Sequence, residues 1–159
     1  SAYFRQILLK SETSMISLED EVEYTENYLK IQQLVHPGLF SYIIQMPESV
    51  DSFGIQMPAM LLQPIAENCI KHGFKNIRKG GKIIIDIEEK DGILKIVFTD
   101  NGRALTREKT EEQLSQSKVV VLTKKRINLM LENNHEKVSV RLYSEAENTI
   151  FEIQYPCIF

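Results

Sequence analysis

The thirteen residues from Leu62 to Phe74 read LQPIAENCIKHGF and combine a helical apolar pattern with polar residues that packing does not require. With the residues before them they predict a helix over roughly 59–72, in which Pro64 either kinks the helix or marks its first firm turn. Gly73 is expected to end this helix, because glycine readily leaves the helical conformation. Asn68 adjoins the apolar stripe of the helix and is therefore a candidate functional residue. The stripe consists of Leu61, Leu62, Ile65, Ala66, Cys69 and Ile70.

The flanking sequence supplies further elements on both sides of this helix. Ser17 stands three residues before Asp20 and forms a variant capping box for a helix that runs to about Leu34. The first 16 residues are expected to be the tail of a helix that begins outside this chain. Downstream, Asp91-Gly92 is a favoured pair for a hairpin turn. The other expected elements are strands at 39–46, 82–89, 93–99, 137–143 and 149–155 and a helix at 119–132.

The order of these elements favours an α+β fold. Antiparallel hairpins with helices between them indicate a sheet with helices on one face, and the other face is then partly solvated. Between the two hairpins, the polar stretch from Asp100 to Lys118 predicts a long loop. A loop of that length in a compact domain is usually functional or mobile.

Composition excludes several classes of protein. The chain has 159 residues, enough for one domain, and its 43% hydrophobic and 26% charged residues are typical of a globular protein. Its formal net charge of −3 predicts no surface for nucleic acid. The apolar runs are short, so we expect neither a membrane span nor a signal peptide. Cys69 and Cys157 lack metal or disulfide spacing and are expected to be buried thiols in a reducing compartment.

A few polar residues have chemistry that suits a nucleotide. The amide oxygen of Asn68 is a neutral ligand for Mg²⁺, and Asp100 could accept a hydrogen bond from the exocyclic amine of adenine. Gly102 would let the backbone approach a flat base, and Lys71 could offer a charge to phosphate. Each residue also has a purely structural interpretation. Asn68 could bond a neighbouring loop, Asp100-Asn101-Gly102 is a common turn sequence, and Lys71 could simply be solvated.

The combination of motifs favours the functional interpretation. LQPIAENCIKHGF, then TDNG at 99–102, then NTIF at 148–151 occur in that order at domain-scale spacing. With SLEDEVEYTENYLKIQQL at 17–34 and PAMLLQP at 58–64, the chain resembles the catalytic, ATP-binding domain of LytS/YesM-type sensor histidine kinases. The resemblance implies the GHKL (Bergerat) fold, a two-layer α/β sandwich with a mixed, mostly antiparallel sheet. It also implies that residues 1–34 comprise the end of the dimerisation helix region and the entry helix, and that residues 35–159 form the ATP-binding catalytic domain.

The resemblance implies a role for each matching residue, with ATP and Mg²⁺ as the cofactors. Glu67 would orient the incoming imidazole, although a solvated helix carboxylate is an equal alternative at that position. The nucleotide would lie between the 59–72 helix and the 100–102 turn. The remaining implied roles are Mg²⁺ coordination for Asn68, a phosphate contact for Lys71, packing against the base for His72, adenine recognition for Asp100 with Gly102, and a place near the adenine pocket for Thr149.

Several positions depart from the family pattern, and they lie on the phosphate side. Ala104 replaces the second glycine of DNGxG, and Asn148 replaces the glycine of GTxF. Ser117 and Val119 stand where the glycines of the lid are usual, and Leu122 stands at a usual asparagine. Glycines let backbone amides turn toward phosphates, and a β-branched residue would be strained in that conformation. We therefore expect a mobile lid and weak ATP binding.

The function implied by the resemblance is transfer of the γ-phosphoryl group of ATP to a histidine outside this fragment, since no PHFLFN-like phosphoacceptor segment occurs here. The expected partners are the dimerisation and phosphoacceptor domain of the parent chain and a response regulator. The parent would be a homodimeric membrane receptor of which this is a cytoplasmic domain. Two alternatives are a degenerate kinase domain that acts as a scaffold and a GHKL ATPase module of the gyrase, chaperone or mismatch-repair kind.

Overall fold

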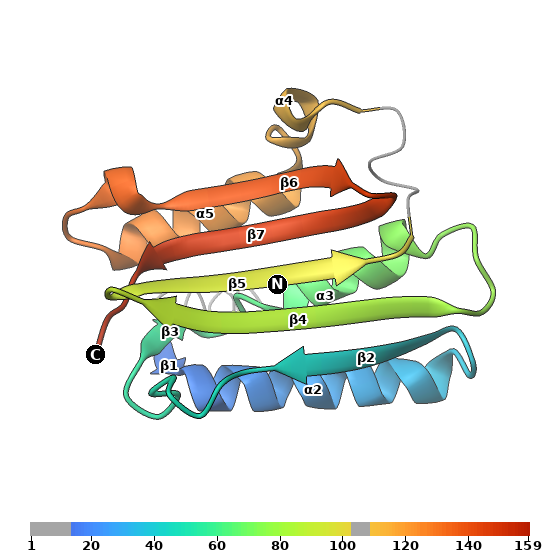
Figure 1. Cartoon of the computed structure of the whole chain (residues 1–159), viewed down its shortest axis with the longest axis horizontal. Helices are drawn as coiled ribbons and strands as arrows, with labels where there is room; N and C mark the ends of the chain where they lie inside the picture. The colour runs from blue at the N-terminus through green and yellow to red at the C-terminus, as the bar shows by residue number, and fades with distance from the viewer. Residues whose placement is uncertain (1–13, 103–108) are drawn as a thin grey trace, which may run out of the picture.

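The computed structural model describes residues 14–102 and 109–159, and these form two layers (Figure 1). A five-stranded sheet is one layer, and helices cover one of its faces. The predicted α+β fold class is therefore confirmed. The helices are α2 (Leu18–Val35), α3 (Gln63–Asn68), α4 (Glu111–Leu114) and α5 (Lys118–Met130), with a π-helical turn η1 (Cys69–Gly73) and a 3₁₀ turn η2 (His135–Lys137).

The sheet has the strand order β2–β4–β5–β7–β6, in which β2 and β4 are parallel and the other neighbours antiparallel. The hairpin between β4 and β5 turns at Asp91 and Gly92, whose φ angles are +53° and +79°, as the Asp-Gly pair predicts. The register of β5 and β7 sets Asp100 opposite Thr149. The strands are β1 (Met15–Ser17), β2 (Phe40–Gln45), β3 (Gln56–Pro58), β4 (Gly81–Lys90), β5 (Ile93–Asp100), β6 (Ser139–Glu145) and β7 (Asn148–Pro156).

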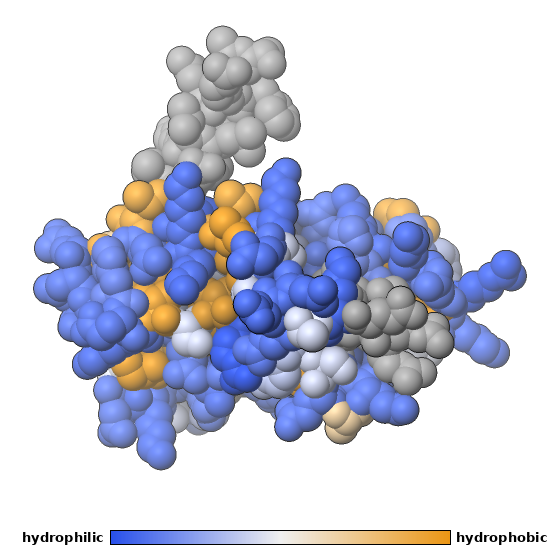
Figure 2. Space-filling view, turned by 90° about the horizontal axis from the view of Figure 1, so that it is seen from above, coloured by the Kyte–Doolittle hydropathy of each residue, from blue (hydrophilic) through white to orange (hydrophobic). Residues whose placement is uncertain are grey.

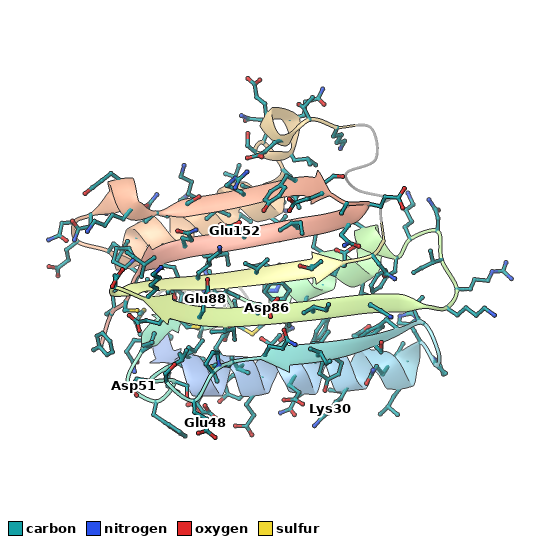
Figure 3. All side chains as sticks on the ribbon, in the orientation of Figure 1. Lys30, Glu48, Asp51, Asp86, Glu88 and Glu152 are labelled. Atoms are coloured by element: carbon teal, nitrogen blue, oxygen red, sulfur yellow. The ribbon has the colours of Figure 1, made fainter. Side chains whose placement is uncertain are left out.

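The two faces of the sheet differ in polarity. Along β4 and β5 every second residue is buried against the helices, while the outer face carries Asp86, Glu88 and Glu152 (Figure 3). Glu152 lies 3.9 Å from the charged groups of both Lys95 and Arg141. The outer face thus carries charged side chains, some of them paired, and the core lies between the sheet and the helices. In that core Cys69 is buried as predicted, whereas Cys157 is only partly buried.

The start of the described chain differs from the prediction. Residues Met15–Ser17 form β1, which pairs antiparallel with β3, so the expected helical tail is wrong for residues 14–16. The preceding 13 residues lie outside the described part of the chain. The capping of the next helix is confirmed, because the hydroxyl of Ser17 accepts a hydrogen bond from the backbone N–H of Asp20 at 3.1 Å. Within the described residues no helix is long and apolar enough to cross a membrane.

The helix predicted over 59–72 begins later and changes its winding. It starts at Gln63, and Pro64 occupies its first turn, where proline needs no hydrogen-bond donor. The alternative in which Pro64 kinks the helix is therefore wrong. After Asn68 the helix continues as η1, in which the backbone N–H of Phe74 bonds the carbonyl of Cys69 at 3.0 Å. Such π-helical turns often mark functional positions.

The loop expected between Asp100 and Lys118 is partly helical. Residues 103–108, including Ala104, lie outside the described residues. From residue 110 onward a capping box of Thr110 and Gln113 starts α4, and Leu114 is buried. The guanidinium of Arg141 on β6 bonds both carboxylate oxygens of Glu111 at 2.9 Å. A four-residue helix with one buried side chain has too little periodicity to be predicted from sequence.

Candidate functional site

The carboxyl group of Asp100 ends β5 in a nearly closed environment. The residue is 3% exposed, its Oδ1 accepts a hydrogen bond from the backbone N–H of Gly102 at 3.0 Å, and the thiol of Cys69 also bonds it. Burial raises the pKa of Asp100 to about 7, although both hydrogen bonds act to lower it. This group therefore changes between its neutral and charged forms near neutral pH.

Two glycines and a threonine complete this part of the site. The hydroxyl of Thr149 donates to the carbonyl of Gly102 at 3.0 Å and so joins β7 to the residue that follows β5. A Cβ added to Gly73 would lie 2.9 Å from Oδ1 of Asp100, and one added to Gly102 would lie 1.9 Å from the carbonyl oxygen of Gly73. Both positions therefore require glycine. We refer to Cys69, Gly73, Asp100, Gly102 and Thr149 as the strand-end cluster.

A cleft of about 560 Å³ lies beside this cluster, between α3 with η1 on one side and α5 on the other. Asn68 faces the cleft while the next residue, Cys69, faces Asp100, because successive helical residues point about 100° apart. One helix thus serves both the cleft and the strand-end cluster. The residues that line the cleft include Glu67, Asn68 and His72 on one wall and Lys118, Val119, Leu122 and Arg126 on the other.

The structure does not bring all the predicted site residues together. Lys71 is exposed, forms an ion pair with Glu67 one turn earlier, and lines a different groove beside Ile70 and Ile77. The nucleotide space expected between the 59–72 helix and the 100–102 turn stays a prediction. Gly102 packs directly on Gly73, and the adjoining cleft opens between α3 and α5.

Two charged residues near the cleft were not among the predicted site residues. Glu21 on α2 is 1% exposed, and its carboxylate accepts hydrogen bonds from the backbone N–H groups of Met60 and Leu62 at 2.9 and 2.8 Å. Arg126 on α5 donates to the carbonyl of Met60 at 2.8 Å and to the carbonyl of Ala59. A signal for Glu21 existed in the sequence, because it falls on the buried stripe of α2 with Leu18, Thr25 and Leu29.

Some known proteins resemble this chain in sequence, and others resemble it in fold. Sensor protein LytS of Staphylococcus saprophyticus is 31% identical over 112 residues, which are 70% of this chain and 19% of LytS. Sensor histidine kinase/phosphatase LytS of Staphylococcus aureus (strain MRSA252) is 31% identical over 110 residues, 69% of this chain and 18% of the relative. In sequence the chain therefore resembles LytS-type sensor histidine kinases over about 70% of its length. It spans less than a fifth of the length of these curated relatives, and no family model matches it.

Solved structures show that this chain has the fold of histidine kinase catalytic domains, which confirms the implied GHKL architecture. The catalytic domain of histidine kinase ThkA superposes with a TM-score of 0.59 at 12% identity, covering 90% of this chain and 95% of that chain. Acinetobacter baumannii histidine kinase AdeS gives a TM-score of 0.61 at 14% identity, covering 90% of this chain and 66% of that chain. At such identities the likeness concerns the fold alone.

The lid positions of this chain have ordinary backbone geometry where the structure describes them. Ser117 is the N-cap of α5 with φ −64° and ψ 149°, and Val119 lies in the first turn of the helix. Between residues 109 and 130 no described residue has a positive φ. The strain expected at Val119 is therefore absent, because helix α5 begins where the family pattern has a glycine loop. Apolar side chains gather at the surface over α5 (Figure 2), where Val121, Leu122 and Leu129 are exposed.

Proposed function

We propose that this domain binds Mg-ATP and is the catalytic part of a two-component sensor histidine kinase. It would transfer the γ-phosphoryl group to a histidine outside the chain. The observation that carries the proposal is the buried carboxyl group of Asp100, fixed by Gly102 and Thr149 at the end of the central strands and adjoining the helix that presents Asn68 to the cleft. The names of the LytS relatives, sensor histidine kinases, support it.

Adenine recognition would depend on Asp100. In its charged form the carboxylate accepts a hydrogen bond from an exocyclic amine and discriminates against bases that present a carbonyl there. Gly73 and Gly102 support this role, since a side chain at either position would meet the carboxylate or the neighbouring backbone. Thr149, which holds the Gly102 carbonyl, keeps this arrangement in register. His72 lines the adjoining cleft, and we propose that its ring packs against the base.

The phosphates and Mg²⁺ would occupy the cleft. Within the described residues no cluster of three or more acidic, histidine or cysteine side chains could hold a metal ion, so the chain would contribute a single neutral ligand, Asn68. That donor set suits Mg²⁺, which keeps most of its waters and phosphate oxygens. When bound, the ion would neutralise phosphate charge. Lys118 and Arg126 line the opposite wall and would add positive charge near the phosphates.

Glu67 would assist phosphoryl transfer to the histidine. In that step the imidazole nitrogen bonds the γ-phosphorus, the bond from phosphorus to the β–γ bridging oxygen breaks, and ADP leaves. The imidazole N–H proton would pass to Glu67, whose carboxylate lines the cleft and is held by Lys71. This pairing gives Lys71 an orienting role in place of the phosphate contact. The remaining catalysis would consist of positioning and charge neutralisation.

The parent protein would act on a response regulator. Histidine kinase ThkA has been solved in complex with the response regulator TrrA, and its fold matches this chain with a TM-score of 0.57. We propose the same class of partner here, with a phosphohistidine in the dimerisation domain as the donor. The parent would be a homodimeric membrane receptor, with this domain on the cytoplasmic side.

Calorimetric titration with ATP and with adenosine tests the proposal. Asn68→Ala should weaken ATP binding about tenfold in the presence of Mg²⁺ and leave adenosine binding unchanged, because the amide oxygen serves only the metal. Asn76→Ala, an exposed asparagine outside the cleft, is the matched control. An equal loss of ATP affinity with and without Mg²⁺ would mean that Asn68 does not coordinate the metal ion. Failure of the unchanged protein to bind either ligand would overturn the proposed function.

A domain that binds nucleotide without turnover is the second candidate. Val119 and Leu122 present apolar side chains to the cleft where the family pattern has a glycine and an asparagine, and this observation favours it. Incubation of the domain with labelled ATP and the phosphoacceptor domain of its parent separates the candidates. Labelled phosphohistidine supports the kinase, whereas ATP binding without transfer supports the scaffold. The similarity to LytS favours both over a gyrase-like ATPase.

A further inference from the structure

The turn formed by Ala59, Met60, Leu61 and Leu62 is held from one side by a buried carboxylate. Oε1 of Glu21 accepts the N–H of Met60 and Oε2 accepts the N–H of Leu62, so both carboxylate oxygens bond backbone that leads into α3. Leu62 directly precedes α3, and Met60 lies two residues earlier. Glu21, on a different helix, therefore fixes the backbone that enters α3.

The same turn is held from its other side by a guanidinium group. Arg126 bonds the carbonyl oxygens of Ala59 and Met60, and a planar guanidinium is suited to two adjacent acceptors. Met60 has φ +63°, a strained conformation for a methionine that persists where its surroundings fix it. We call Glu21, Arg126 and the turn between them the clamp.

The clamp joins the two walls of the cleft to a third helix. α3 begins directly after the turn, and Arg126 belongs to α5, so the turn sets how far apart the two walls stand at this end. Met60 and Arg126 themselves line the cleft. Glu21 connects this assembly to α2, whose first residue, Leu18, also bonds the carbonyl of Ile55 at 2.8 Å. A displacement of α2 would therefore reach the cleft through the hydrogen bonds between the Glu21 carboxylate and the turn.

We propose that Glu21 and Arg126 are positioning residues that set the width of the cleft and couple it to α2. The inference rests on the proposed function, and it assigns the clamp to the phosphate part of the ligand. The strand-end cluster is built from hydrogen bonds of β5 and β7, which do not involve the turn. Loss of the clamp should consequently weaken ATP binding while adenosine binding changes little.

The test compares ATP and adenosine affinities of clamp variants by calorimetry in the whole domain. Glu21→Gln turns one acceptor into an NH₂ donor that faces a backbone N–H. Arg126→Lys replaces two guanidinium nitrogens, each bonded to one carbonyl, with a single ammonium nitrogen that does not reproduce this fixed geometry. Each should weaken ATP binding about tenfold and adenosine binding less than about twofold. Glu23→Gln and Lys125→Met are exposed controls on the same two helices and should change neither affinity.

A double variant separates positioning from direct contact. Arg126 lines the cleft and could touch phosphate, whereas Glu21 is 1% exposed and acts only through the turn. If both act through the turn, Glu21→Gln combined with Arg126→Lys should lose less ATP affinity than the product of the two single losses. If Glu21→Gln fails to fold, Glu21→Asp, which keeps the charge and shortens the reach, replaces it in both measurements.

The outcomes distinguish this inference from the proposed function. An unchanged protein that binds neither ligand overturns the proposed function. Suppose that the unchanged protein binds both ligands. Clamp variants that weaken ATP binding and adenosine binding equally, or that weaken neither, then contradict only the proposed role of the clamp. If the double variant loses ATP affinity by the product of the two single losses, Glu21 and Arg126 do not act through the same turn, and the proposed shared mechanism is wrong.

Discussion

The strand-end cluster and the cleft lie side by side but are built in different ways. In the cluster, a carboxylate, two backbone groups and a hydroxyl bond one another at 3.0 Å, and glycines bring backbone segments together. In the cleft, side chains of two helices face each other across a space of about 560 Å³, and the clamp joins the helices at one end. The register of a sheet fixes the first arrangement, whereas helix packing decides the second.

This difference explains where the sequence departs from its family pattern. Every element of the cluster depends on backbone geometry, so a substitution there would disturb the strands themselves. The first turn of α5 contributes only side chains to the cleft, and Ser117 and Val119 are accommodated there without unusual φ angles. We therefore expect base recognition to be the stable property of this domain and phosphate binding to be the adjustable one.

The largest expected effect breaks the cluster itself. In Gly102→Ala, the new Cβ would lie 1.9 Å from the Gly73 carbonyl oxygen and 2.9 Å from the ring of Phe74, so β5 and η1 must separate. Adenosine affinity should fall about a hundredfold or more, and the free energy of unfolding should drop by about 1–3 kcal/mol. Calorimetry and urea unfolding measure the two effects.

The control for this change is Gly80→Ala. Its Cβ meets open space, although φ of +80° should cost roughly 1 kcal/mol of stability. Adenosine affinity should stay unchanged in this control. If Gly102→Ala also kept its adenosine affinity, the strand-end cluster would not be the base site.

The second-largest effect is expected from a variant that removes the charge of the Asp100 side chain and keeps its shape. Asp100→Asn should weaken adenosine and ATP equally, by roughly 1.5–3 kcal/mol, because the lost hydrogen bond involves a charged group and touches only the base. Calorimetric titration with both ligands measures the loss, and Asp86→Asn on the outer sheet face is the control. A loss of affinity confined to ATP would indicate that Asp100 contacts the phosphates and not the base. The two regions would then not have separate roles.

A change of pH should act on the cluster more weakly. Because burial raises the pKa of Asp100 to about 7, lowering the pH protonates the free domain and removes the acceptor for the amine. Affinity for adenosine, which has no phosphates to titrate, should fall about tenfold between pH 8 and pH 6. Asp100→Asn should show no such slope. A pH-independent affinity in the unchanged domain would show that the charged form of Asp100 is not the one that binds.

The smallest expected effect concerns the first turn of α5 and its influence on phosphate binding in the cleft. Ser117→Gly with Val119→Gly removes an apolar side chain from the cleft and lets the first amides of α5 approach a phosphate. ATP affinity should rise about fivefold and adenosine affinity should not change. Val121→Gly, on the same helix, pays the same helix-propensity cost without altering the cleft lining. Equal ATP affinities in the paired variant and in this control would mean that the start of α5 does not limit phosphate binding.

The sequence by itself determined the elements that depend on local chemistry. The Ser17 cap, the Asp91-Gly92 turn and the strands around it follow from hydrogen bonds and φ preferences of neighbouring residues. The motif residues Asn68, Asp100 and Thr149 could be named because their polar groups interrupt apolar patterns. Where local signals were weak, as in β1 and α4, the prediction failed, because three- and four-residue elements are stabilised by their partners in space.

Only the tertiary structure decided how these residues combine. It divides the predicted site into a buried cluster and an open cleft, pairs Glu67 of the cleft lining with Lys71, which lies outside that lining, and brings α5 opposite Asn68. It also joins Glu21 to a turn 39 residues away along the chain. Contacts between residues so far apart in sequence depend on the packing of α2, α3 and α5 against one face of the sheet, and no local preference encodes that packing.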